Sequence, residues 1–331
     1  MLRFRKADGG DRGRSIYSFD TDDDSPRYAI KRWLALFAIG VVLLGVIGHV
    51  SYVRETTFAT ARSQGLIAAN LLSQNSARLF DMAEYLAVDL EGRIGGRGWD
   101  AIAADRDLWE GTARAVARFP YVSAVSLFDT TGDLQFTTLA HPAPPFSAGD
   151  RDYFRAHLTG NAPTEAESIV SRPLWGSVAN RPIFFVTRAL RAPDGELRGV
   201  IGVSLRTDYF KNFLETFRLP FSPTLQLVRQ NDGTILAREP GEPLADVQRV
   251  DEPVRTVVGS GRLTQPLETD AAIVTVQRLP QWPVYAVVSF DRAAVEAAWK
   301  AAVVDFVVIG AVAIAALIAL AALAPGRRLD P

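Results

Sequence analysis

The sequence contains no cysteine, and histidine is scarce: His49, His141 and His157 are its three copies among 331 residues. Without cysteine there is no disulfide framework, no thiolate nucleophile and no cysteine-ligated metal site. The chain also has no His-Glu-x-x-His, Gly-x-Ser-x-Gly or Gly-x-x-x-x-Gly-Lys-Ser/Thr motif. We therefore expect a protein that is not an enzyme and that needs no cofactor or metal ion.

A strong net charge is also missing. Lysine and arginine number 36 and aspartate and glutamate number 37, which gives a formal net charge of −1. Proteins that bind nucleic acid normally carry a basic surplus, so no nucleic-acid partner is expected. A chain of this length can also bury enough apolar surface to fold without disulfides.

Long hydrophobic runs, by contrast, are present at residues 31–53 and 301–324. Each is close to the ~20 apolar residues that a helix needs to cross ~30 Å of hydrocarbon. We therefore predict two transmembrane helices. The segment from Arg54 to Ala301 has no such run and is expected to fold as a water-exposed domain.

Basic residues flank the ends of the two runs that face the chain termini. Because cytoplasmic segments next to a membrane carry an excess of lysine and arginine, both termini are expected in the cytoplasm and the domain in the periplasm of a bacterial inner membrane. Residues 1–30 then form a disordered cytoplasmic tail and 325–331 a short one. A cleaved signal peptide is the alternative for the first run, but no small-residue cleavage site follows it. The basic residues are Arg3, Arg5, Lys6, Arg12, Arg14, Arg27, Lys31, Arg32, Arg327 and Arg328.

A long helix is predicted for residues 54–98. Leu72, Leu79 and Leu86 recur at intervals of seven residues, which is typical of a packing seam along one helix face. This seam either covers the rest of the same domain or also contacts a parallel helix of a second copy, and we expect a homodimer. Glycines from Gly95 onward are expected to end the helix.

Strand and turn signals then occur twice along the chain. Val122–Phe128 leads into a turn that ends at Gly132, and Leu225–Arg229 leads into a turn that ends at Gly233. Glycine suits the positive φ that such hairpin turns require. Each half closes with an apolar strand that feeds a helix. We therefore predict an α+β fold in which two antiparallel-sheet units follow the long helix.

Short motifs in both units resemble those of a known family. The first unit carries Asp150–His157, then Ile169–Pro173, then the glycine-bounded strand Gly199–Val203, and the second carries Leu227–Arg238. In this order they resemble the double Cache family of extracellular sensor domains, which are also described as tandem PAS-like domains. The resemblance covers residues 54–300.

The resemblance implies a membrane-anchored sensor in signal transduction. Its membrane-distal unit is expected at residues 99–218 and its membrane-proximal unit at 219–300. In this family the distal unit usually holds a small ligand between its sheet and the helix and loops that cover it. The matching ligand-binding positions are Arg151, Asp152, Tyr153, Phe154, His157, Arg172, Trp175, Arg181 and Ser204.

The chemistry of these side chains suits a small polar ligand. Arg172 and Arg181 can offer forked donors to a carboxylate. Tyr153 and Trp175 can wall a pocket and lend a phenol or indole donor. Most of these residues also have an ordinary structural explanation, as core residues, a loop aromatic, a helix-surface residue or members of an ion pair.

Ser204 is a departure from the family. Cache domains that bind amino acids usually place an aspartate on this strand, where it receives the ammonium group of the ligand. With serine at that position, the cations nearby favour an anionic or neutral ligand, such as a small carboxylate.

A signalling output is expected to come from another protein. Double Cache sensors commonly continue from the second span into a kinase, cyclase, phosphodiesterase or chemoreceptor module, and no such module follows in this chain. We expect a separate cytoplasmic or membrane signalling partner. The second unit has no comparable ligand motif and is expected to couple the first unit to the membrane. The alternative is a membrane-anchored interaction or scaffold protein whose Cache domain binds another protein.

Overall fold

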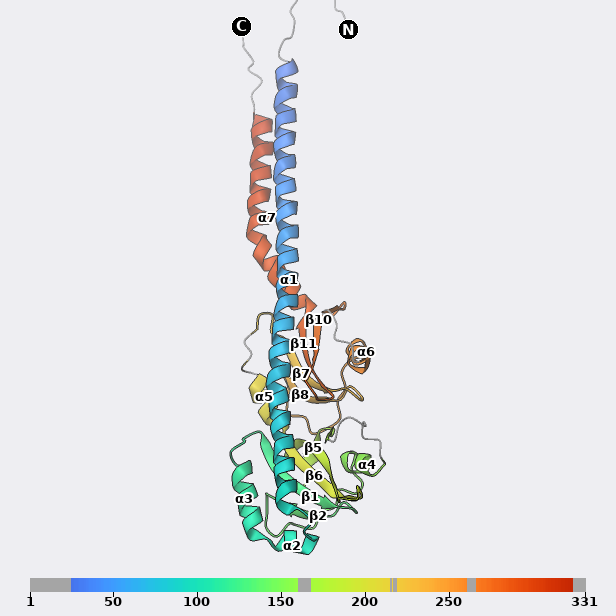
Figure 1. Ribbon diagram of the computed structural model, residues 1–331. Helices are drawn as coiled ribbons and strands as arrows, with labels where there is room; N and C mark the ends of the chain where they lie inside the picture. Colours follow the sequence, from blue (N-terminus) through green and yellow to red (C-terminus); the bar gives the residue numbers. More distant parts are fainter. Residues whose placement is uncertain (1–24, 160–167, 215, 217–218, 261–265, 324–331) are drawn as a thin grey trace, which may run out of the picture. The chain divides into compact units, whose positions relative to one another are not determined.

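The computed structural model describes residues 25–159, 168–214, 216, 219–260 and 266–323 of the chain (Figure 1). The chain divides into two compact parts. We call the residues up to Tyr52 and from Val303 onward the helical part, and Val53–Ala302 the sheet part.

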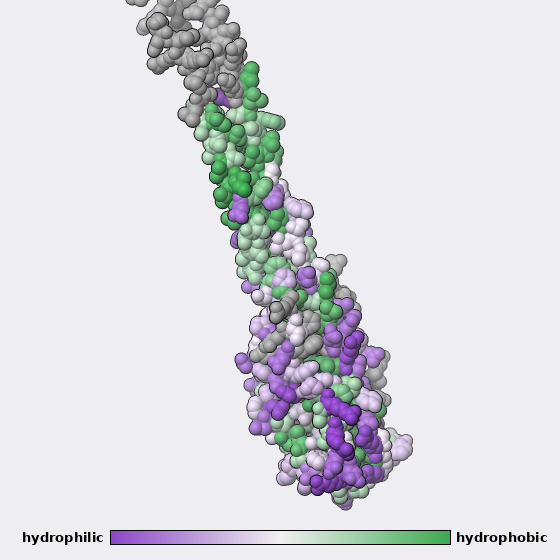
Figure 2. Space-filling model, turned by 90° about the vertical axis from the view of Figure 1, so that its left-hand side faces the viewer, coloured by the Kyte–Doolittle hydropathy of each residue, from purple (hydrophilic) through white to green (hydrophobic). Residues whose placement is uncertain are grey.

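Two helices run through both parts of the chain. Helix α1 spans Ser25–Ile94 and helix α7 spans Arg292–Leu323. Segments of both are long and apolar enough to cross a membrane. In Figure 2, hydrophobic residues gather along the helical part, whereas hydrophilic residues are prominent on the face of the sheet part that this view shows.

The predicted tails fall largely outside the described residues. The expected disordered tail at 1–30 is described only from residue 25, where helix α1 has already begun. The short tail expected at 325–331 lies wholly outside the described residues.

Within the helical part, the two helices approach closely at Gly310. A Cβ atom added there would lie 2.5 Å from a methyl group of Val46. The rings of His49 and Phe306 lie 4.0 Å apart between centroids. Small residues therefore allow the helices to pack against each other in the way that membrane helices commonly do.

The first unit of the sheet part has a six-stranded antiparallel sheet. The strands follow the order β2-β1-β6-β5-β3, and β4 pairs with the first residues of β5. Four helices accompany this sheet. The elements are α2 (Trp99–Ala104), α3 (Arg106–Val116), β1 (Val122–Asp129), β2 (Leu134–Thr137), α4 (Asp152–Leu158), β3 (Ser168–Val170), β4 (Leu174–Gly176), β5 (Arg181–Arg191), β6 (Leu197–Arg206) and α5 (Thr207–Leu214).

The second unit repeats this plan with five antiparallel strands. Their order is β8-β7-β11-β10-β9, and one helix, α6, covers one face of the sheet. Its last strand runs directly into α7. The elements are β7 (Thr224–Arg229), β8 (Ile235–Glu239), α6 (Glu252–Ser260), β9 (Leu267–Glu268), β10 (Ala272–Arg278) and β11 (Val284–Asp291). The α+β fold with a long helix and two antiparallel sheets is therefore as the sequence predicts.

Glycines set the turns that the sequence pattern indicated. Gly132 in the β1–β2 hairpin has φ +91, and Gly233 in the β7–β8 hairpin has φ +67. Helix α1 ends at Ile94, and Gly95 follows with φ +51. Glycine, which has no Cβ atom, adopts such a positive φ at no steric cost.

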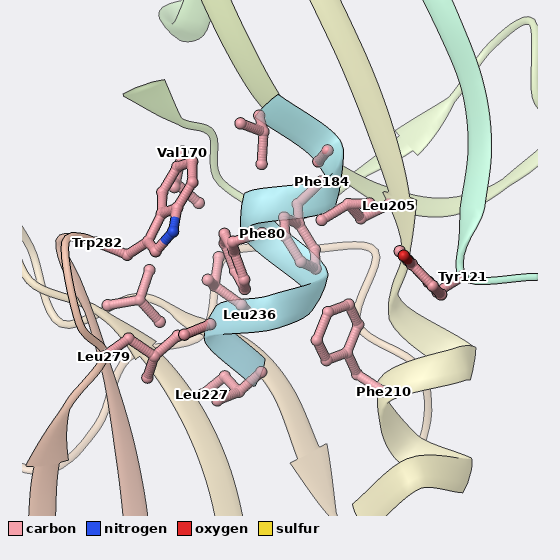
Figure 3. Packing of buried hydrophobic residues seen from close by; sticks show 14 of the residues in the cluster. Phe80, Tyr121, Val170, Phe184, Leu205, Phe210, Leu227, Leu236, Leu279 and Trp282 are labelled. Carbon is pink, nitrogen blue, oxygen red and sulfur yellow. The ribbon is translucent and has the colours of Figure 1, made fainter. Parts of the chain in front are cut away.

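Helix α1 packs against both sheets, and Phe80 marks the centre of this contact (Figure 3). Its ring lies 5.8 Å from that of Phe184 on β5 and 5.3 Å from that of Trp282, which follows β10. The indole Nε1 of Trp282 donates to Asp81 on α1 at 2.7 Å. One continuous core thus joins α1 to the two units.

The predicted seam on α1 is buried inside the same chain. Leu72 and Leu86 are 0% and 4% exposed and belong to this core. Of the two interpretations of the seam, the structure supports the packing within one domain. A partner helix can contact only the opposite face of α1, because the seam itself is already covered.

Candidate ligand-binding site

A small cavity lies in the first unit, between the face of its sheet and the segment that carries α4 and β4. Its volume is about 30 Å³. Most of the lining is apolar, and strands β1, β5 and β6 form its sheet side. The lining residues are Ala124, Ser126, Phe128, Leu134, Leu139, Phe146, Arg151, Tyr153, Leu174, Gly176, Ser177, Val178, Ala179, Ile183, Phe185 and Ser204.

Three of the nine predicted ligand-binding residues line this cavity: Arg151, Tyr153 and Ser204. Arg151 is the residue that precedes α4, and its backbone N–H donates to the carbonyl of Ala148 at 2.9 Å. Ser204 comes from β6 on the opposite wall and donates to the carbonyl of Ala124 at 3.2 Å. The cavity therefore has a cationic side chain and a hydroxyl in an otherwise apolar lining.

Arg151 is the one cationic residue that contributes to the lining. Its Nε is buried and has no hydrogen-bond partner among the described residues. The nearest carboxylate, that of Asp150, is 3.6 Å away and largely exposed. A buried donor without a partner is costly, so an acceptor that enters the cavity gains from meeting it.

Aromatic rings pack around Tyr153 at one side of the cavity. Its ring centroid lies 4.7 Å from that of Phe185 and 6.4 Å from that of Phe128. Burial raises the pKa of the Tyr153 hydroxyl well above its ordinary value. The side chain therefore stays neutral and offers an apolar ring with a phenol group. Phe154 is fully buried in the same cluster but does not line the cavity.

His157 lies on the buried face of α4, outside the cavity. Its Nε2 is 2.9 Å from the hydroxyl oxygen of Thr187 on β5. Burial, with a smaller contribution from the charge of Arg191, lowers the pKa of His157 to about 4. The imidazole is therefore neutral near pH 7 and ties α4 to the sheet.

Arg172 and Asp152 belong to an ion cluster that joins the two units. The Nε of Arg172 donates to Asp232 at 3.0 Å, and Asp152 lies 3.8 Å from the guanidinium groups of both Arg172 and Arg229. Arg172 thus faces the β7–β8 turn of the second unit. It does not line the cavity, because an acidic partner distant in the sequence holds its side chain elsewhere.

Arg229 is the buried member of the cluster. It donates to both carboxylate oxygens of Asp232, at 3.0 and 2.6 Å, and to the carbonyl of Val170 at 3.0 Å. Burial acts to raise the pKa of Asp232, but the hydrogen bonds and charge of Arg229 outweigh it and hold that pKa well below its ordinary value. The cluster is therefore ionised and links β3 of the first unit to β7 of the second.

Trp175 and Arg181 are exposed on the strands that carry the cavity lining. Trp175 on β4 is 52% exposed, and Arg181 is the first residue of β5. Their neighbours Leu174, Gly176 and Ile183 point into the cavity instead. Alternation along β4 sends Trp175 to the face opposite that of Leu174 and Gly176. Arg181 shares a strand face with Ile183, but it stands at the start of β5 and does not line the cavity.

Sequence reasoning missed most of the apolar lining. Ser126 and Phe128 alternate along β1 and so share the face of the sheet on which Ser204 lies. The alternation of Val122–Phe128 was the available signal. It could not show which of the two faces the covering segment would meet.

Solved structures with the same fold are sensor domains. The extracellular domain of rpHK1S-Z16, assigned as a histidine kinase, is 20% identical with a TM-score of 0.57, over 72% of this chain and 97% of its own. The ligand-binding domain of the Pseudomonas fluorescens chemoreceptor CtaA, solved with L-isoleucine, is 17% identical with a TM-score of 0.50, over 75% and 97%. No protein-family model and no curated protein sequence matches the chain.

These similarities bear out the recognition made from the sequence motifs. The sheet part has the fold of extracellular sensor domains of the double Cache type. Two apolar helices in the same chain fit a membrane protein. Of these two solved structures, one is an extracellular domain and the other a ligand-binding domain.

Proposed function

We propose that this chain is a membrane-anchored sensor whose first unit binds a small carboxylate or neutral polar metabolite. Helix segments of α1 and α7 span a bacterial inner membrane, with both termini in the cytoplasm and the sheet part in the periplasm. Binding is signalled to a separate cytoplasmic or membrane protein. The L-isoleucine that is bound to the chemoreceptor CtaA also carries a carboxylate, but the lining of this cavity has no acid to receive an ammonium group.

The buried Nε of Arg151 carries this proposal, because it makes no hydrogen bond among the described residues and has only the exposed carboxylate of Asp150 nearby, at 3.6 Å. A carboxylate that accepts from it forms a charge-assisted hydrogen bond in a largely apolar cavity, where such bonds are strong. Ser204 on the opposite wall offers a hydroxyl and no negative charge. The ligand therefore meets a cation without a competing acid in the lining.

Ligand entry requires the cavity to open. A volume of about 30 Å³ accommodates on the order of one or two water molecules and no metabolite. The lining segment from Gly176 to Ala179, together with Arg151 ahead of α4, forms the cover opposite the sheet. Binding then selects an opened conformation, and the difference in affinity between the two conformations supplies the signal.

Asp152 connects the cavity to the second unit. It stands between two cavity-lining residues, Arg151 and Tyr153, and lies 3.8 Å from Arg229 on β7. A shift of the segment ahead of α4 therefore changes the charge environment of Arg229. This contact is the proposed route by which the first unit acts on the second.

The proposal includes a homodimer, and the exposed face of α1 supports it. Ile67, Leu71, Tyr85 and Val88 are each between 45% and 62% exposed. Ile67 and Val88 are three heptads apart and Leu71 and Tyr85 are two, so the four residues form one stripe along the helix. A second copy that presents the same stripe in parallel buries these side chains.

A ligand screen on the full chain in detergent or nanodiscs tests the binding proposal. We expect small carboxylates to raise the melting temperature, because a ligand of the native state stabilises it by RT ln(1 + [L]/Kd). Arg151→Gln should weaken binding of the best hit about 10- to 150-fold, since a charge-assisted hydrogen bond is lost. Ser204→Asp should also weaken an anion, because a buried carboxylate then faces it.

Arg155→Gln is the matched control for Arg151→Gln. Arg155 lies on the exposed side of α4 and does not line the cavity. Its substitution therefore removes the same charge outside the site. Equal affinity of the wild type and Arg151→Gln for every hit would rule out the first-unit site.

A further inference from the structure

A second and larger cavity lies in the second unit. Its volume is about 670 Å³, which is in the range that ligand pockets occupy. It opens at the end of the sheet where β11 passes into α7, between the start of α6, the end of β8 and the β9–β10 turn. The lining residues are Thr224, Gln226, Arg238, Pro240, Val250, Asp251, Val254, Thr269, Asp270, Ala271, Ala272, Val274 and Ser289.

The lining of this cavity is polar on its sheet side. Thr224 and Gln226 on β7 and Ser289 on β11 alternate with core residues and so face the cavity together. With its amide oxygen turned to the guanidinium, Gln226 accepts from Nε and Nη2 of Arg238 at 3.0 and 3.3 Å. Gln226 therefore orients Arg238 and leaves Nη1 for another acceptor.

Charges of both signs line the cavity. Arg238 makes no ion pair with a carboxylate among the described residues, and neither Asp251 nor Asp270 makes one with a cation there. Asp251 precedes α6 and Asp270 lies in the β9–β10 turn, and both are exposed. One unpaired cation and two unpaired anions around a single cavity fit a ligand that carries an anionic and a cationic group.

The cavity wall is also bonded to the first residue of α7. The backbone N–H of Arg292 donates to the carbonyl of Ala271 at 2.9 Å, and its Nη1 donates to the carbonyl of Thr269 at 3.2 Å. The guanidinium carbon of Arg292 lies 5.6 Å from the ring centroid of Phe58 on α1. The β9–β10 turn thus contacts both long helices of the chain through one side chain.

We propose that the second unit holds a ligand site of its own for a small zwitterion, whose carboxylate meets Arg238 and whose ammonium group meets Asp251 and Asp270. A ligand held by Asp270 restrains the β9–β10 turn and, through Arg292, the start of α7. The second unit is then a sensor as well as a coupler. This goes beyond the proposed function, which places a ligand in the first unit alone.

Thermal shift of the full chain in nanodiscs tests the ligand class. The probes are L-alanine, γ-aminobutyrate and glycine betaine as zwitterions, with acetate and ethylamine as controls that carry one charge each. We expect at least one zwitterion to raise the melting temperature more than either control does. Arg238→Gln should weaken that zwitterion about 10- to 150-fold, because a charge-assisted hydrogen bond is lost.

Two matched variants separate this site from the one in the first unit. Arg249→Gln removes an exposed arginine of the same unit that does not line the cavity, and it should leave the affinity unchanged. Arg151→Gln should likewise leave the zwitterion affinity unchanged, because Arg151 lines only the first cavity. Asp270→Asn should weaken a zwitterion while acetate responds as it does with the wild type.

Hydrogen–deuterium exchange locates the bound zwitterion. We expect slower exchange in residues 268–272 and in the first turn of α7, and none of this slowing in Arg238→Gln.

The proposal is overturned if no zwitterion stabilises the chain beyond the single-charge controls. It is equally overturned if Arg238→Gln retains the full affinity, or if protection by the zwitterion is confined to α4 and β4. The last result would still support a ligand in the first unit.

Discussion

The two units share one plan but enclose very different spaces. The first has a cavity of about 30 Å³ with a mostly apolar lining, and the second has one of about 670 Å³ lined by Arg238, Asp251 and Asp270. The position of the covering helix accounts for this. In the first unit, Tyr153 on α4 packs onto the sheet. In the second unit, α6 covers the cross-strand pair Val228 and Tyr285 and leaves the pair Thr224 and Ser289 uncovered.

The comparison teaches that topology alone does not locate a ligand site. The same sheet face is closed in one unit and open in the other, according to where the connecting segment sets its helix. Each difference between the units can be tested by changing one residue at a time.

The largest effect is expected where the two units meet. Arg229→Met should lower the free energy of unfolding by up to about 3–5 kcal/mol, because the largely buried carboxylate of Asp232 then keeps only the half-exposed Arg172 as its cation. Arg172→Met removes a half-exposed partner of the same carboxylate and should cost at most about 1 kcal/mol. Urea titrations of both variants, followed by circular dichroism, measure the difference.

The double variant Arg229→Met/Asp232→Asn provides a further check. It removes both charges and should be less destabilised than Arg229→Met alone. Equal losses for Arg229→Met and Arg172→Met would contradict the idea that burial makes Arg229 the dominant member of the cluster.

Acid should affect the first unit through His157. The folded state lowers the pKa of this residue to about 4 from an ordinary value of 6.5, so protons bind preferentially to the unfolded chain. The stability is therefore undiminished above pH 6.5 and falls as the pH drops toward 4, by about 3 kcal/mol from this residue. The second unit contains no histidine and has no matching loss.

His157→Gln tests this assignment. Unfolding free energies at pH 7 and pH 4 should differ by about 3 kcal/mol less in the variant than in the wild type. His141→Gln serves as the control, because His141 is the other histidine of the first unit. Parallel pH profiles for the wild type and His157→Gln would show that another group causes the acid sensitivity.

A smaller effect is expected where α1 crosses the second sheet. A Cβ atom at Gly65 would lie 2.6 Å from the hydroxyl oxygen of Thr275 on β10. Gly65→Ala should destabilise by about 1–2 kcal/mol, since overpacking outweighs the better helix propensity of alanine. Gly92→Ala on the same helix meets nothing within 4 Å and should stabilise. Thermal unfolding of the two variants should therefore shift in opposite directions.

The smallest effect concerns two serines in equivalent positions. Ser204 and Ser289 each lie two residues before the end of the strand that feeds a helix, β6 and β11. Ser204 is buried and donates to a carbonyl, so Ser204→Ala should cost about 1 kcal/mol. Ser289 borders the open cavity, and Ser289→Ala should be close to neutral in a denaturant titration. Equal costs would mean that both sheet faces are equally closed.

Local signals made the fold predictable. Glycines marked both hairpins and the end of α1, and strand alternation followed by a helix occurred in both units. The seven-residue pattern of α1 predicted a packed face correctly. The pattern could not show that the sheets of the same chain cover that face, because a repeat along one helix does not identify the segment that packs against it.

The residues that line the cavity were harder to predict from the sequence than the fold was. The segment around residue 151 contributes Arg151 and Tyr153 to the cavity, and Ser204 lines it from the opposite wall. Arg172 was expected to offer its forked donors to a carboxylate ligand. Its partner Asp232 is 60 residues away and belongs to the other unit. The direction of a long charged side chain depends on such distant partners.

The direct passage from β11 to α7 has a consequence for engineering. Asp291 ends the strand and Arg292 begins the helix, so no linker separates sheet from helix. Each residue inserted at this junction turns everything downstream by about 100° around the helix axis, because a turn takes 3.6 residues. Chimeras that graft this sheet part onto a foreign span must therefore preserve rotational phase. Chimeras whose junctions differ in length by whole heptads should behave alike. Chimeras whose junctions differ by other lengths should differ in signalling activity without ligand.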